Sequence, residues 1–174
     1  MMDKNLWNQM YPKEEIERIE QMELLNDKRE TVLEKSRNQI STRLEPIFNA
    51  IFSKNFATNK SKDLIDAQAS SLSLRQSINE SIAKHTYSLF KVKSENNFLE
   101  QEKYLFYSIG VSIKLTSDRA KKIMIDGNLR ENVRQSEIIE AHIEFLRECL
   151  KTLESYQYSI KNAISLMEYL GGNN

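Results

Sequence analysis

The strongest constraint on the fold is an apolar repeat near the C-terminus, between Leu129 and Leu170. Residues there recur in alternating steps of four and three, and eight of the nine positions are apolar: Ile139, Ile143, Leu146, Leu150, Leu153, Gln157, Ile160, Ile164 and Met167. This period is typical of a long helix with a coiled-coil seam, and Gly171 and Gly172 predict its end. The eight apolar residues are the candidate oligomer interface. The pattern fits packing within one chain, between chains, or both.

Composition favours helices over strands. The chain of 174 residues holds only four glycines and two prolines, and an all-β fold needs many tight turns that would use more of both. Apolar residues make up 40% of the chain and charged residues 29%, so a core can form and disorder is not expected. We predict an all-α fold, a long antiparallel helical hairpin with coiled-coil seams plus an N-terminal helical extension.

The hairpin is expected within residues 63–174. A second seam, with three polar positions among nine, precedes the first: Ile78, Ile82, His85, Leu89, Val92, Asn96, Leu99, Lys103 and Phe106. Gly110 predicts the end of this helix. Thr116, Ser117 and Asp118 are candidate N-caps for a short helix, and Asp126-Gly127-Asn128 predicts a turn. Two long helices joined through this short unit form an antiparallel hairpin.

Residues 1–62 are expected to form the extension. Pro12, followed by Glu14 and Glu15, predicts the start of a charged helix that Pro46 ends or kinks. The apolar segment 46–56 is interpreted as a short helix that packs within the protein, and a docking peptide for another protein is the alternative. The polar segment 57–62 predicts a linker, and Asp63 is a candidate cap for the next helix.

No catalytic or metal-binding motif occurs in the sequence. His85 and His142 belong to no cluster with metal-ligand spacing. Phosphate-binding glycine loops and nucleophile motifs are also missing from the sequence. We therefore expect no enzymatic activity, no metal and no cofactor. Cys149 lies beside the apolar seam and is expected to be a packed thiol.

Charge and cysteine content indicate where the protein acts. The chain has 25 basic and 25 acidic residues, so any surface for nucleic acid has to be a local patch. A single cysteine cannot form an intramolecular disulfide, which favours a reducing compartment. No apolar run approaches the length of a membrane span, and the first residues show no secretory signal. We expect a cytoplasmic protein without a membrane partner.

Residues 84–122 are the most basic stretch. Eight basic residues stand against four acidic ones, which gives a net charge of +4, and aromatic residues are interleaved with them. Basic side chains can neutralise phosphates, and exposed rings can stack on unpaired bases. The plainer interpretation is a solvated helix face with aromatic residues in the core. The candidate nucleic-acid-binding residues are Lys84, Lys91, Lys93, Lys103, Tyr104, Tyr107, Lys114, Arg119, Lys121 and Lys122.

Three segments resemble the UvsY family, the recombination mediators of T4-type bacteriophages. The first is Glu102-Lys103-Tyr104-Leu105-Phe106-Tyr107, a basic residue followed by a helix end with paired aromatics. The second runs from Ile113-Lys114-Leu115-Thr116 to Asp126-Gly127-Asn128, and the third is Ser159-Ile160-Lys161-Asn162-Ala163-Ile164 with Gly171 shortly after. The segments occur in the family's order and spacing, and the resemblance covers roughly residues 73–172.

The resemblance implies a non-enzymatic protein for DNA recombination and repair. It implies a closed homo-oligomer, expected to be a ring, that binds single-stranded DNA. It also implies that the protein helps a RecA-like recombinase to replace a single-strand-binding protein. Lys103 is the best-supported contact with DNA, with Tyr104 and Tyr107 as stacking groups. For a phage-encoded protein the compartment would be the cytoplasm of the host cell.

The chain departs from the family's pattern in three places. Gln101 stands where the family tends to have a second basic residue, and Tyr156 and Tyr158 lie near a displaced aromatic position. Residues 1–62 have no counterpart in the family. A coiled-coil structural adaptor or scaffold without nucleic-acid binding is therefore the alternative function, with the region from Ile16 to Phe56 as its partner surface.

Overall fold

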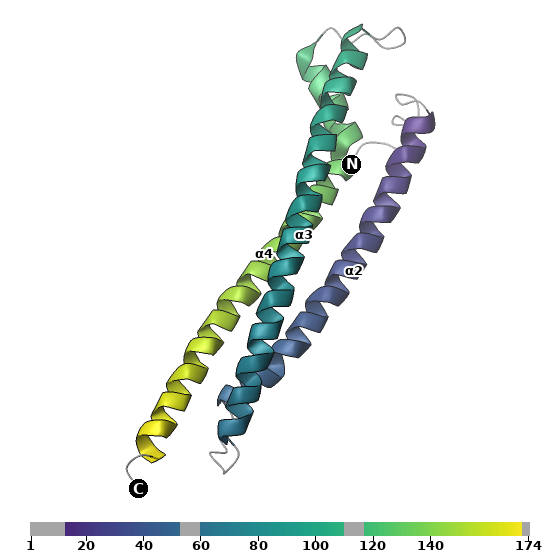
Figure 1. The fold of residues 1–174 in the computed structure, drawn as a ribbon. Coiled ribbons are helices and arrows are strands. Elements are labelled where there is room, and N and C mark those ends of the chain that lie inside the picture. The colour runs from purple at the N-terminus through teal and green to yellow at the C-terminus, as the bar shows by residue number, and fades with distance from the viewer. Residues whose placement is uncertain (1–12, 53–59, 110–116, 172–174) are drawn as a thin grey trace. The chain divides into compact units, whose positions relative to one another are not determined.

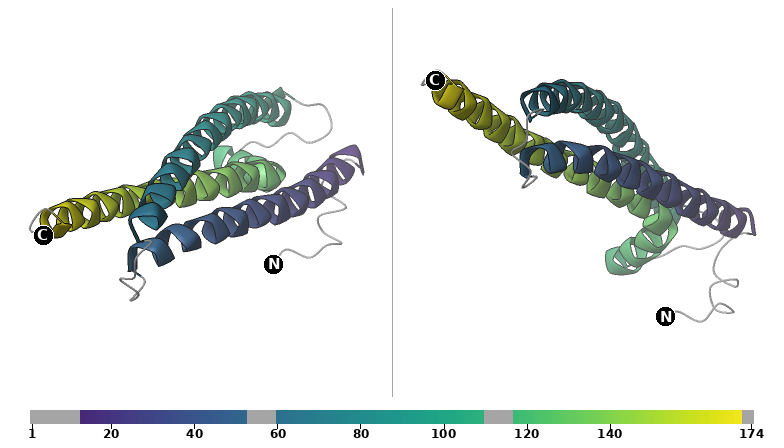
Figure 2. Two further views of the ribbon diagram at one scale, coloured as in Figure 1. Left: turned by 60° about the horizontal axis from the view of Figure 1, so that its bottom comes forward. Right: turned by 90° about the horizontal axis from the view of Figure 1, so that it is seen from below.

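The chain folds into long helices. A computed structural model describes residues 13–52, 60–109 and 117–171, and these form the helices α2 (Lys13–Phe52), α3 (Lys60–Ile109) and α4 (Asp118–Gly171) (Figure 1). The described ranges contain no strand, so the predicted all-α class is confirmed. Figure 2 shows the same three helices from two further directions. No helix in the described ranges is long and apolar enough to cross a membrane.

Each helix contributes to two compact units. The first unit is drawn from Met1–Val32 and Tyr87–Glu140, and the second from Leu33–Thr86 and Ala141–Asn174. Each unit therefore contains one segment of α2, one of α3 and one of α4. The units do not follow the predicted division after residue 62, because α2 supplies side chains to both. Residues 53–59, which include the first part of the predicted linker, lie outside the described ranges. The helix α3 begins at Lys60, within the segment predicted as linker.

Contacts between the helices give their directions within each unit. In the first unit Tyr107 of α3 pairs with Asn128 of α4, while Asn96, earlier in α3, pairs with Ser136, later in α4. The two segments are therefore antiparallel, as the hairpin prediction requires. The α2 segment is parallel to α4, because Arg18 contacts Asn128 and residues further along α2 contact positions further along α4.

The second unit has the same arrangement. Arg75 of α3 contacts Glu154 of α4, whereas His85, later in α3, lies against His142, earlier in α4. Along α2 and α4, Phe48 packs near Tyr156, with the two ring centroids 6.0 Å apart. Each unit is thus a three-helix arrangement in which the middle helix runs against the other two.

The predicted seam of α4 lies inside the chain. In the second unit Leu146, Leu153 and Ile160 have no exposed surface, and the core around them combines residues from all three helices: Ile40, Ile47, Leu64, Ala67, Leu74, Ile78 and Cys149. Leu150, Ile164 and Met167 are partly buried against it. Ile139 and Ile143 are also buried. All eight residues of the candidate oligomer interface are therefore engaged in packing within one chain. Packing within one chain was the first of the three alternatives that the sequence pattern allowed.

Helix termination at Pro46 was a wrong prediction, because α2 continues through this residue to Phe52. Proline removes one backbone hydrogen bond, the one to the carbonyl four residues earlier, at Thr42. Pro46 and Thr42 are both exposed, so water can satisfy that carbonyl. On the other side of the helix Ile47 is almost fully buried, and this packing holds the helix together.

The turn predicted at Asp126-Gly127-Asn128 is also wrong, since these residues lie inside α4. Asn128 donates a hydrogen bond from Nδ2 to the hydroxyl oxygen of Tyr107 on α3, at 2.6 Å. Its backbone carbonyl accepts a bond from Arg18 on α2. These contacts with two other helices outweigh the local turn preference of the sequence. The predicted short helix is therefore the first part of α4, which begins at Asp118, and the end of α4 at Gly171 agrees with the predicted boundary.

His142 is the most unusual polar group in the core of the second unit. Its side chain has no exposed surface, and neither ring nitrogen has a hydrogen-bond partner among the described residues. The His85 ring lies 4.8 Å away between centroids, and the Arg37 guanidinium lies nearby on α2, over the Phe145 ring. Burial, together with the charges of His85 and Arg37, lowers the pKa of His142 to about 4.

We predict that folding stability falls as the pH drops from about 6.5 to about 4. In this window the unfolded chain protonates this histidine and the folded chain does not, so protons favour unfolding by up to about 3 kcal/mol. Urea unfolding of the His142→Phe variant and the parent at pH 7.5 and pH 4.5 should show a smaller loss of stability in the variant. An equal loss in both would contradict the assignment.

Candidate nucleic-acid interface

One of the candidate residues for nucleic acid, Tyr107, belongs to a small core in the first unit. That core contains Tyr107, Met124, Ile125 and Leu129, with Ile16 and Leu99 packed against it. Tyr107 is only 3% exposed, and its hydroxyl is held by Asn128. Burial raises the pKa of this hydroxyl. Because the ring cannot reach a base from this position, Tyr107 is removed from the candidate interface and assigned to the core.

Lys103 also has a structural contact that the sequence did not indicate. Its Nζ lies 2.8 Å from Oε2 of Glu15 on α2, and both side chains are largely buried, with exposed fractions of 20% and 13%. Glu15 also accepts a hydrogen bond from Arg18 at 2.9 Å. Burial alone would raise the pKa of Glu15, but the bonds from Lys103 and Arg18 outweigh it and hold the pKa below its usual value. Lys103 therefore ties α3 to α2.

This pairing predicts that Lys103 contributes to stability. A double-mutant cycle with Lys103→Met and Glu15→Gln should give a coupling energy of roughly 1–3 kcal/mol, because either single change leaves a partly buried charge without its partner. Chemical denaturation at pH 7 measures it. The exposed pair Lys13–Glu17 is the matched control and should couple by only about 0.3–0.5 kcal/mol. Equal coupling in both cycles would contradict the structural role of Lys103.

The other basic candidates differ in how free they are. Lys93 pairs with Glu140 of α4, and Lys91 pairs loosely with Glu95 at 3.9 Å. Both lysines keep more than half of their side-chain surface exposed. Lys84 is exposed and belongs to the second unit, whereas Arg119 and Lys122 are exposed in the first. Lys114 lies outside the described residues. In the first unit, Arg119 and Lys122 are thus accessible near the start of α4, and Lys91 and Lys93 are accessible on α3.

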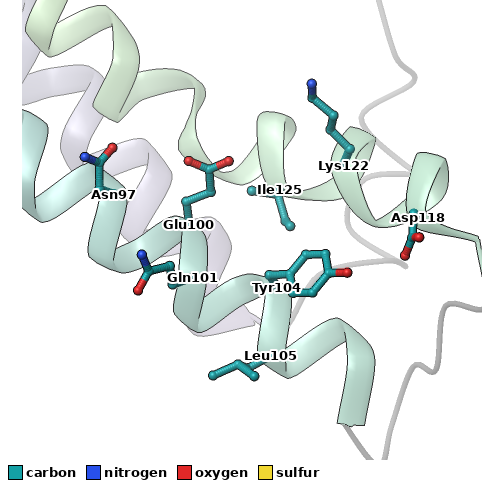
Figure 3. Close-up of a pocket in the computed structure, with 8 residues that line it drawn as sticks. All are labelled: Asn97, Glu100, Gln101, Tyr104, Leu105, Asp118, Lys122 and Ile125. Atoms are coloured by element: carbon teal, nitrogen blue, oxygen red, sulfur yellow. The ribbon is translucent and has the colours of Figure 1, made fainter.

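A groove of about 870 Å³ lies between the end of α3 and the start of α4 in this unit (Figure 3). Eight residues line it: Asn97, Glu100, Gln101, Tyr104, Leu105, Asp118, Lys122 and Ile125. Figure 3 shows the Tyr104 ring lying between the two helices, with Asp118 and Lys122 on the α4 side. The groove offers one aromatic ring, two amide groups and charges of both signs.

Tyr104 of the groove contacts Lys121, the neighbour in sequence of the lining residue Lys122. The Lys121 ammonium lies 5.3 Å from the centroid of the Tyr104 ring, within range for a cation–π contact. The same ammonium pairs with Asp118 at 3.2 Å. The ring keeps 47% of its surface exposed, so its accessible part can receive a planar group. This arrangement suits a base on the ring and a phosphate beside the neighbouring cations.

Three of the aromatic residues interleaved with the basic ones were not among the candidate site residues but are exposed. Tyr87, Phe90 and Phe98 of α3 are each about 70% exposed. They lie outside the seam of α3, whose members Ile78, Val92 and Leu99 face inward. Because these three residues fall outside the repeat of the seam, the sequence spacing could have predicted that they are exposed. The partners of Lys103 and Tyr107, in contrast, left no signal, because Glu15 and Asn128 lie on other helices.

The described residues bear on two other kinds of site, a metal centre and a reactive cysteine. They contain no group of three or more His, Cys, Asp or Glu side chains that could hold a metal ion. Cys149 is buried in the second unit. Burial, with a smaller contribution from Glu148, raises the pKa of its thiol, which keeps it protonated and poorly nucleophilic. The packed thiol expected from the sequence agrees with this placement.

Comparisons of the chain with models of protein families, with curated proteins and with solved structures found no match. The resemblance to the UvsY family therefore rests on the three sequence segments. Two of those segments carry contacts seen in the structure, since Lys103 and Tyr107 belong to the first and Asn128 to the second.

Proposed function

We propose that the protein is a non-enzymatic recombination mediator that binds single-stranded DNA in the groove between α3 and α4. The observation that carries the proposal is the half-exposed Tyr104 ring beside Lys121, with Lys122 and Arg119 on the same part of α4. The resemblance to the UvsY family supports it. In this role the protein helps a RecA-like recombinase to take the place of a single-strand-binding protein, in the cytoplasm of the host cell if it is phage-encoded.

The groove suits a single strand better than a duplex. A base can stack on Tyr104 only if it is unpaired, and such stacking contributes about 1–3 kcal/mol per base. The amides of Asn97 and Gln101 can hydrogen-bond to a base edge. The carboxylates of Glu100 and Asp118 oppose phosphates, so the site is weak in one copy. Repetition of the groove in a homo-oligomer would raise the overall affinity.

Modest affinity per copy fits the work of a mediator. A protein that assembles a recombinase filament has to hold the strand while the single-strand-binding protein leaves and then release it. Binding based on a few phosphate contacts and stacked bases is reversible and salt-dependent. No covalent bond is made or broken in this process, which agrees with a site built from an aromatic ring, amides and cations.

Binding of a labelled single-stranded oligonucleotide, followed by fluorescence anisotropy over a salt series, tests the proposal. Tyr104→Ala should weaken binding about 5- to 100-fold, the equivalent of one lost stacking contact. Lys122→Ala should lower the slope of log affinity against log salt by about one phosphate contact. Tyr169→Ala and Lys161→Ala, at exposed positions of α4 in the second unit, are the matched controls. No binding at low salt, or equal losses in the controls, would overturn the proposal.

A structural adaptor without nucleic-acid binding is the second candidate function. It is favoured by exposed apolar side chains on α2, where Leu25 and Val32 lie seven residues apart and therefore share one face of the helix. They are 53% and 62% exposed. Deleting α2 would not test this surface, because Ile40 and Ile47 of the same helix belong to the core.

Substitutions on the surface of α2 separate the two functions. Changing Leu25 and Val32 together to Glu should abolish capture of a protein partner and leave oligonucleotide binding unchanged if the protein is an adaptor. Leu166→Glu, at an exposed leucine of α4, is the matched control, and circular dichroism checks that the helices persist. Capture that survives the double change would exclude this face as the adaptor surface.

A further inference from the structure

The outer face of α3 in the first unit carries an apolar stripe that nothing in the described chain covers. Its apolar members are Tyr87, Phe90, Phe98, Leu105 and Ile109, which are between 58% and 76% exposed. Ser94 and Gln101 complete the stripe, whose seven positions then follow one another at intervals of three, four and four residues, repeated twice. An eleven-residue repeat of this kind completes three turns of a straight helix, so the whole stripe stays on one side. Exposed apolar stripes on this scale are typical of interaction surfaces.

We propose that this stripe, hereafter the α3 stripe, binds the same stripe of a second copy of the chain in antiparallel orientation. The two-fold axis passes through Ser94. Phe90 then lies beside Phe98 of the second copy, and Tyr87 lies beside its Gln101. The same contacts occur twice because the surface is self-complementary, as two-fold symmetry requires. The inference goes beyond the DNA-binding proposal and does not rest on it, although the two surfaces share Gln101 and Leu105 at their border.

Charges beside the α3 stripe fit this orientation. Lys91, Glu95 and Glu102 lie on one flank of the stripe, and all three are exposed. Two antiparallel helices related by a two-fold axis bring the same flank of each copy together. With Ser94 on the axis, Lys91 lies within one helical turn of Glu95 of the second copy, and the reciprocal pair repeats the contact. On the other flank, Lys93 is paired with Glu140 of the same chain, and Glu100 lies beside Asn97 and Tyr104.

The area available is adequate for a specific interface. Aromatic side chains bury about 150 Å² or more each, and a two-fold pair brings together six of them from the α3 stripe. Six such side chains supply about 900 Å², which is close to the roughly 1,000 Å² that a specific interface needs. The seam of α4 cannot supply this contact while it is buried in the cores of the chain. The α3 stripe, in contrast, is exposed along its length and free to associate.

Disulfide cross-linking of the full chain tests the geometry. Two helices packed 8–10 Å apart bring residues on the two-fold axis within reach of a disulfide. Ser94→Cys should therefore form a covalent dimer under mild oxidation. Glu102→Cys, eight residues from the axis, places the two thiols about 24 Å apart along the helices and should not. The parent, whose single Cys149 is buried, should stay uncross-linked. Equal cross-linking of the two variants would overturn the proposed orientation.

Light scattering with size-exclusion chromatography tests the energetics. Phe98→Glu should weaken self-association by at least about a hundredfold, because two carboxylates would be buried beside apolar rings. Tyr158→Glu, at an exposed position of α4, should not weaken it. Lys91→Glu and Glu95→Lys should each weaken it about tenfold, whereas the double change should restore it, since the opposite charges meet again. Circular dichroism confirms that each variant is helical.

Two outcomes would overturn the inference. One is an equal molar mass for the Phe98→Glu variant and the parent protein, whether the parent is a monomer or an oligomer. The other is loss of oligonucleotide binding in Phe98→Glu without any change in mass, which would assign the α3 stripe to bases and not to a second copy. Failure of the DNA-binding proposal is recognised separately, because the cross-linking and mass measurements contain no nucleic acid.

Discussion

Burial of the apolar residues of α4 is the interaction on which the rest of the structure depends. In the second unit Leu146, Leu153 and Ile160 pack against residues of α2 and α3, and in the first unit Ile125 and Leu129 pack against Tyr107 and its neighbours. Full burial of one such aliphatic side chain contributes roughly 1.5–3 kcal/mol. Propensity alone does not hold helices of this kind in place, and a single cysteine excludes a disulfide within the chain. Packing on α4 is therefore what fixes α2 and α3 in each unit.

Because this seam is used inside the chain, the surfaces proposed for DNA and for a second copy lie mainly on the outside of α3. Successive residues of a helix point about 100° apart, so a few neighbouring positions can serve different surfaces. Tyr107 enters the core, Tyr104 borders the groove, and Phe98 belongs to the α3 stripe. Because the inward face is anchored, the other two are presented on a rigid element, which suits both a base-stacking site and a helix–helix contact.

The sequence predicted what depends on periodicity and could not predict what depends on distant partners. The all-α class and the inward-facing seam residues followed from spacing that is local along the chain. The errors at Pro46 and Gly127 arose because turn and breaker preferences are weak compared with packing, here of Ile47 and of Asn128 with Tyr107. The α2 helix was read as an extension because its broken apolar stripe did not show that it packs on both α3 and α4.

The candidate site shows the same limit in its electrostatics. The net charge of +4 in residues 84–122 counts only the acids within that stretch, whereas the carboxylates that meet Lys103 and Lys93 come from Glu15 and Glu140. Subtracting these two leaves a net charge of +2 for the stretch and its partners. A surface with so little excess charge attracts DNA weakly and only at short range. Any strong binding by this neutral chain therefore has to come from stacking and from several copies acting together, which makes self-association a condition for the proposed function.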